Sequence, residues 1–218
     1  MDTSEDIIEK TKDFVKKELK KAEGGHDWFH ILRVYNNAML ISNNEKVDGF
    51  VVALGALLHD IADSKFHDGD ETVGPQKARE FLFGLNIDSV IIQHVVNIIE
   101  NISFKGGNEA QKFKSPELDV IQDADRLDAI GAIGIARAFN YGGFKDRKLF
   151  DPSIQPNLKM TKEEYKASTT PTINHFYEKL LLLKDRMNTK TGKKIALDRH
   201  KYMEQFLDQF YAEWDGEK

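Results

Sequence analysis

The chain of 218 residues contains no cysteine, which excludes disulfides, thiolate zinc sites and cysteine nucleophiles. It has no apolar run of membrane-spanning length, and no apolar leader segment follows its acidic first residues. An excess of basic charge is also absent, since the formal net charge is −5, whereas domains that bind long nucleic acids are usually basic. We therefore expect a cytoplasmic protein with neither a membrane nor an extended nucleic acid as partner.

Helical periodicity dominates the sequence, and no run of alternating residues favours strands. Two local signals mark helix starts: Ser115-Pro116 places a capping side chain before a proline, and Thr161 with Glu164 can form a capping box. We predict one all-α domain with irregular structure over 64–74 and 140–157. The predicted helices cover 3–22, 27–43, 48–63, 74–84, 88–101, 116–140, 161–187 and 193–213.

The pair His59-Asp60 is the most unusual feature, because it ends the apolar run 51–58. Burial of a charge without a partner is costly, so this pair needs compensation, and a divalent cation is the simplest candidate. On the predicted helix 48–63, Asp63 lies one turn further along the same face. A core of purely structural residues would not need these side chains there.

Further metal-competent side chains lie on other predicted helices. His26 and His30 precede the pair and share one helix face, so spacing alone allows either as a ligand. Asp123 and Asp125 follow it and cannot share a face, which leaves two alternatives there as well. A mixed imidazole and carboxylate set suits several first-row divalent metals and leaves positions for water and substrate.

The order His30, His59-Asp60, Asp125 resembles the H…HD…D signature of the HD-domain superfamily of metal-dependent phosphohydrolases. The resemblance covers nearly the whole chain and is most specific to a bacterial subgroup of small HD hydrolases that includes YpgQ and YedJ. It implies an HD core over about 26–130, additional C-terminal helices over about 161–213, and those four side chains as metal ligands. The segments that carry the likeness are 26–34, 57–61, 99–104, 122–139, 141–143 and 175–180.

The same resemblance implies one divalent metal ion, with Mn²⁺ or Mg²⁺ favoured over Co, Ni, Fe or Zn, and a nucleotide or another small phosphate ester as substrate. A nucleoside triphosphate would be cleaved to monophosphate and pyrophosphate, and a nucleoside monophosphate phosphomonoesterase is the close alternative. The metal would polarise a phosphoryl oxygen and lower the pKa of its bound water. Asp63 is the expected residue for orienting or deprotonating that water. A homodimer is left open.

Counter-charges for the phosphates lie next to the expected ligands. Arg33 is one turn from His30, although a structural ion pair would explain it equally well. Asp128, one turn beyond Asp125, would instead accept from a sugar hydroxyl or a base edge, or fix Lys65 or Arg33. Asn101 belongs to a candidate pocket rim that also includes the segment 141–147. The expected substrate contacts are Lys65, Arg126, Asp128, Arg33 and Asn101.

Two other functions compete. A di-iron oxygenase of the same superfamily usually carries a lysine three residues after the His-Asp pair, where this chain has Asp63, and His94 is its one spare histidine for a second metal. A non-catalytic HD module would usually have lost a ligand. Assistance by His26, His67 or His94 stays open, and His175 and His200 are interpreted as structural. Gly131 and Gly134 lie within a predicted helix and favour close packing over a nucleotide loop.

Overall fold

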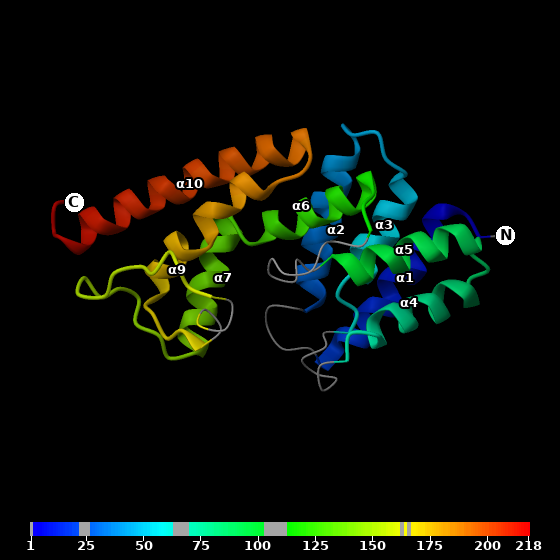
Figure 1. Ribbon diagram of the computed structural model, residues 1–218, viewed down its shortest axis with the longest axis horizontal. Coiled ribbons are helices and arrows are strands. Elements are labelled where there is room, and N and C mark those ends of the chain that lie inside the picture. The colour runs from blue at the N-terminus through cyan, green and yellow to red at the C-terminus, as the bar shows by residue number, and fades with distance from the viewer. Residues whose placement is uncertain (1, 22–26, 63–69, 103–112, 162–163, 165–166) are drawn as a thin grey trace. The chain divides into compact units, whose positions relative to one another are not determined.

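The computed structural model describes the chain apart from residues 1, 22–26, 63–69, 103–112, 162–163 and 165–166 (Figure 1). The described residues contain helices and no strand, which confirms the all-α prediction. They form two compact units, Met1–Asp125 and Arg126–Lys218. None of the helices in the described part of the chain is long and apolar enough to cross a membrane.

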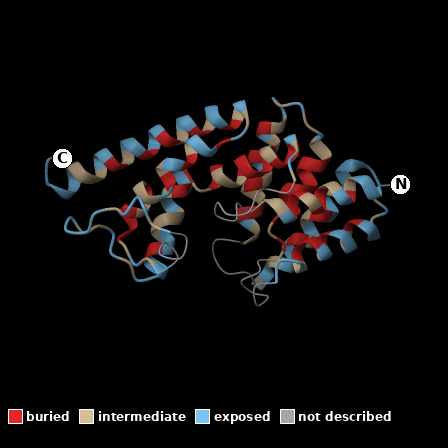
Figure 2. Cartoon of the chain, in the orientation of Figure 1, coloured by how far each residue is buried: buried red, intermediate tan, exposed pale blue. Residues whose placement is uncertain are grey.

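The first unit is built around α3 (Gly49–Leu58), which packs against α1, α2 and α5. Every residue from Val51 to Leu58 is buried, as expected for a helix that is apolar on nearly all sides (Figure 2). At Gly55 a Cβ atom would lie 2.6 Å from the Ile121 side chain, so glycine lets α6 approach closely. The other elements are α1 (Ser4–Glu18), η1 (Leu19–Lys21), α2 (Trp28–Ser42), α4 (Val73–Gly84), α5 (Ser89–Asn101) and most of α6 (Pro116–Asp128).

Helix α3 ends at Leu58, five residues before the predicted end at 63. His59 and Asp60 lie in the turn that follows, where Ile61 N–H donates to Leu58 O at 3.3 Å. The prediction that His59, Asp60 and Asp63 share one helix is therefore wrong for the first two. The physical reason is that the His59 ring bonds to the backbone of the last helical turn. Asp63 itself lies outside the described residues.

The second unit consists of α7 (Gly131–Phe144), α9 (Thr172–Glu178), η3 (Leu180–Arg186) and α10 (Lys190–Trp214). Helix α10 packs against α7 and η3, and α9 contacts the same two elements. Its core is aromatic, with Phe139, Phe176 and Phe206 at centroid separations of 5.9 to 6.0 Å. Helix α10 starts earlier than predicted because the Thr189 side chain caps it, accepting from Gly192 N–H at 2.9 Å.

The helix predicted over 116–140 is two helices, α6 and α7, separated at Ala129 and Ile130. Gly131 has a φ of +75°, which a side chain tolerates poorly, and it begins α7 instead of lying within a helix. At Gly134 a Cβ atom would lie 2.3 Å from Ala129 O, so a glycine here lets the backbone that leads into α7 pass close to the helix. Residues 140–144, predicted as irregular, belong to α7.

The helix predicted over 161–187 is also interrupted. The capping box is present, with Thr161 N–H donating to Glu164 at 2.7 Å and Glu164 N–H to Thr161 Oγ1 at 3.1 Å. Residues 168–171 are nevertheless non-helical, because proline at 171 cannot continue a helix and restricts the residue before it. The rest of the segment consists of the short α9 and the 3-10 helix η3.

Candidate metal centre

Three metal-competent side chains converge in the first unit. One ligand atom from each of His30, His59 and Asp60 lies within 4.8 Å of the other two. His30 comes from α2, and the pair comes from the turn after α3. Asp125 on α6 adjoins this group, with its Oδ1 at 3.6 Å from His30 Nε2. Side chains far apart in the sequence therefore meet at one place.

His59 is held in one orientation by the helix that precedes it. Its Nδ1 lies 2.8 Å from the carbonyl oxygen of Ala56. A carbonyl oxygen can only accept, so Nδ1 carries the hydrogen and Nε2 keeps the lone pair that a metal needs. The His30 ring packs edge-on against it, with centroids 5.6 Å apart at 69°. A contact like that between His59 Nδ1 and the Ala56 carbonyl fixes both the tautomer and the direction of a metal-ligating histidine.

His30 is positioned by the start of its helix. Asp27 caps α2, and its Oδ1 accepts the His30 backbone N–H at 2.9 Å. Further along α2, the Asn37 side chain donates to Ala124 O at 3.4 Å, which ties α2 to α6 beside Asp125. Neither Asp27 nor Asn37 is among the site residues predicted from the sequence. An aspartate three residues before a helical histidine is a recognisable capping signal, whereas the Asn37 contact depends on tertiary structure.

The burial and charge of these side chains suit a divalent cation with an accessible side. The His30 side chain is 3% exposed, and that of Asp125 is 46% exposed. His59 is buried and Asp60 is half-buried, so imidazoles form the floor and carboxylates the open edge. Metal ligands must be deprotonated, so two imidazole and two carboxylate ligands would carry a charge of −2, which a divalent ion balances. The nitrogen and oxygen donors suit several first-row metals. These four side chains therefore fit a divalent metal ion.

Residue spacing left Asp123 and Asp125 as alternative ligands, and the structure places them in different environments. Asp123 is completely buried, whereas Asp125 lies next to His30.

Arg33 is half-buried on α2. Asn101 ends α5 and donates to Asn97 O at 2.9 Å, while Gln122 donates to Asn101 O at 3.3 Å. Asp63, Lys65, His26 and His67 lie outside the described residues, so the roles expected for them stay predictions.

Two expected substrate contacts have partners within the second unit. Arg126 donates through Nη1 to Arg186 O at 2.8 Å. The Asp128 carboxylate is buried and ion-paired with Arg137. Both residues belong to the last turn of α6, directly after Asp125. Contact with a substrate would have to add to these interactions or replace them.

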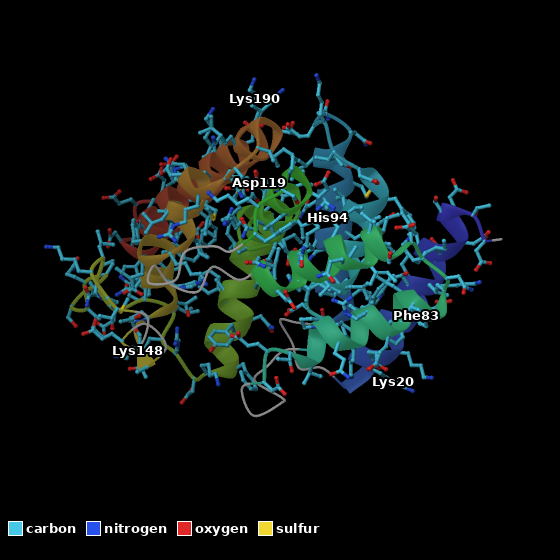
Figure 3. The ribbon with its side chains drawn as sticks, turned by 45° about the vertical axis from the view of Figure 1, so that its right-hand side comes forward. Lys20, Phe83, His94, Asp119, Lys148 and Lys190 are labelled. Atoms are coloured by element: carbon cyan, nitrogen blue, oxygen red, sulfur yellow. The ribbon has the colours of Figure 1, made fainter. Side chains whose placement is uncertain are left out.

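The remaining histidines have local partners. His94 on α5, labelled in Figure 3, has its Nε2 at 3.0 Å from Ser115 Oγ and 3.4 Å from Glu117 Oε2. Within the described ranges it joins no group that could hold a metal. His200 Nε2 lies 3.1 Å from Lys184 Nζ. Burial, followed by the charges of Lys179 and Arg147, lowers the pKa of His175 to about 4.

Comparison with known proteins adds to this geometry. The family model of the HD domain matches residues 28–130. YpgQ of Bacillus subtilis is 37% identical over 95% of this chain and 94% of its own. The crystal structure of YpgQ in complex with ADP has a TM-score of 0.75, with 32% identity over 96% of each chain. That of an HD-superfamily hydrolase from Bacillus thuringiensis has a TM-score of 0.79, with 44% identity over 98% of this chain and 99% of the other.

Proposed function

The chain belongs to the HD-domain superfamily of metal-dependent hydrolases, and from this premise we propose that it hydrolyses nucleotides. The substrate we propose is a nucleoside triphosphate, cleaved to a monophosphate and pyrophosphate. The similar protein YpgQ was crystallised with ADP, which supports a nucleotide over other phosphate esters. We further propose that Mn²⁺ or Mg²⁺ is the working metal, because half of the donor set is carboxylate oxygen.

The observation that carries this proposal is the convergence of His30, His59 and Asp60, with Asp125 beside them. We propose these four side chains as the metal ligands. A divalent ion held there would polarise a phosphoryl oxygen and lower the pKa of an attacking water. The Ala56 carbonyl keeps the Nε2 lone pair of His59 directed to the site, and the Asp27 cap fixes the start of the helix that carries His30.

A hydrolysis also needs a proton acceptor and charge neutralisation. We propose that Asp63 takes a proton from the attacking water, so that the water oxygen bonds to the α-phosphorus while the bond from that phosphorus to the bridging oxygen breaks and pyrophosphate leaves. Arg33 is half-buried one turn after His30 on α2, and we propose that it contacts the phosphates. The roles of Lys65, Arg126, Asp128 and Asn101 as further substrate contacts belong to the same proposal.

The test is a screen of nucleoside mono-, di- and triphosphates with Mn²⁺, Mg²⁺ and Co²⁺, in which phosphate and pyrophosphate are measured separately. The proposal predicts pyrophosphate from triphosphates. Phosphate from monophosphates would instead favour a phosphomonoesterase with the same ligands. Oxygen consumption with two irons per chain would favour the oxygenase. Absence of any product from every nucleotide with metal bound would contradict the proposal.

A further inference from the structure

A pocket of about 350 Å³ lies within the second unit, between α9, α10 and the segment that follows α7. Its size is at the lower end of the range for small-molecule sites. The rings of Phe150, Tyr177 and Tyr211 form much of its wall, and Ile154 and Pro156 complete the apolar part. The metal centre uses none of these residues.

The aromatic wall is held in place by its neighbours. The Phe150 ring lies edge-to-face with Tyr211 at 5.3 Å and 71°, and with Trp214 at 5.1 Å and 86°. This is a favourable arrangement for aromatic rings, and it fixes the direction of the Phe150 face. A wall of rings that are already ordered suits a flat, aromatic ligand, because little conformational freedom is lost on binding.

The wall also carries polar groups, which are the hydroxyls of Tyr177 and Tyr211 and the amide of Asn174. Burial, together with a hydrogen bond to Tyr177, raises the pKa of Tyr211, so the Tyr211 hydroxyl keeps its hydrogen at neutral pH. One hydrogen joins the two hydroxyls, which leaves the other available to a ligand acceptor. Nearby, the 1% exposed Asn174 donates from Nδ2 to Ile154 O at 3.0 Å. Asn174 also lines the pocket, where its side chain adds an amide to the aromatic wall.

The charge of the lining limits the ligand further. The residues around the pocket are aromatic, aliphatic or amide, and none of them carries a formal charge. A phosphate group would find no counter-charge there. A neutral ligand with a flat ring, a hydrogen-bond donor and an acceptor is complementary to this lining.

We propose that this pocket binds an uncharged nitrogen heteroaromatic ring of nucleobase size. The ring stacks on the aromatic wall, an N–H of the ligand donates to Asn174 Oδ1, and a tyrosine hydroxyl donates to a ring nitrogen. This proposal does not depend on the substrate of the metal centre, because it rests on residues of the second unit alone.

Adenosine is the probe, titrated into the full-length, metal-loaded protein by isothermal calorimetry. We expect a single site with a dissociation constant below about 1 mM. Ile154→Trp places a large ring in the pocket from a position that is 39% exposed, and it should weaken binding at least about tenfold. Tyr177→Phe keeps the ring and removes one hydroxyl, so it should weaken binding by a smaller factor. Phe83→Trp, at an exposed position on α4 in the other unit, is the matched control and should leave the affinity unchanged.

Three results would overturn the proposal. The first is the absence of adenosine binding to the wild-type protein, and the second is unchanged affinity in Ile154→Trp. The third is loss of adenosine binding in a folded His59→Ala variant, because it would place the ligand at the metal centre. Retained adenosine binding in His59→Ala supports the pocket whether or not the protein hydrolyses nucleotides. Circular dichroism of each variant verifies that it is folded.

Discussion

The Nδ1 atom of His59 lies 2.8 Å from the carbonyl oxygen of Ala56, three residues earlier in the chain. The last turn of α3 thus uses one of its free carbonyls to orient a side chain of the candidate metal centre. The apolar helix therefore has two functions: its buried face forms the core of the first unit, and its end presents His59 and Asp60 together.

Replacement of His59 by alanine should abolish turnover and metal binding together. In the proposed site the ring is a nitrogen ligand at the floor, and alanine supplies none. Metal content by mass spectrometry and nucleotide turnover are measured on the same preparation. His94→Ala is the matched control, because His94 has its partners at Ser115 and Glu117, and it should keep the metal. Full metal content in His59→Ala would show that the ligand set is wrong.

Replacement of Asp27 by alanine should weaken metal binding by about 10- to 100-fold, the usual effect of losing a residue that orients a ligand. It should also lower the free energy of unfolding by about 1 kcal/mol, because the N-cap of α2 is lost. Asp88→Ala removes the equivalent cap from α5. If both variants lose stability and only Asp27→Ala loses metal affinity, the cap positions His30. Equal metal affinity in the two would refute that role.

Much of the first unit could be predicted from the sequence, and the reasons are local. Helices α1, α2, α4 and α5 follow from apolar periodicity and capping residues, and the residues of the metal site stood out because charged groups ended an apolar run. The early end of α3 could not be predicted, because it involves a ring-to-backbone bond at His59. The break before α7 depends on the positive φ of Gly131, which periodicity does not reveal. The sequence alone also gave no sign of the pocket beside α9.

Replacement of Gly131 by alanine should destabilise the second unit by about 1 to 3 kcal/mol. Its φ of +75° is unfavourable for alanine, and the new Cβ would lie 3.0 Å from the Arg199 side chain. Gly143→Ala, in the same helix but with no atom within 4 Å of a Cβ, should instead stabilise the protein by about 0.5 to 1 kcal/mol. Urea denaturation measures both. Equal effects of the two substitutions would contradict the conformational explanation.

The protein should lose stability in mild acid through His175. Its pKa is about 4 when folded and 6.5 when unfolded, so the unfolded chain binds the extra proton between these values. The stability associated with His175 is therefore present above pH 6.5 and is lost as the pH falls towards 4. The linkage amounts to about 2 kcal/mol between pH 7 and pH 5. His175→Gln should reduce this pH dependence of the free energy of unfolding, and an unchanged dependence would contradict the lowered pKa of His175.

The most direct test of the central claim compares turnover of a nucleoside triphosphate by the wild-type protein and by a His59→Ala, Asp60→Ala double variant, after chelation and again after addition of Mn²⁺. We predict that the wild-type protein releases pyrophosphate when the metal is restored and none when it is removed. The double variant should be inactive in both conditions and should bind no metal. Full turnover by the metal-free double variant would contradict the assignment of this site as a metal-dependent nucleotide hydrolase.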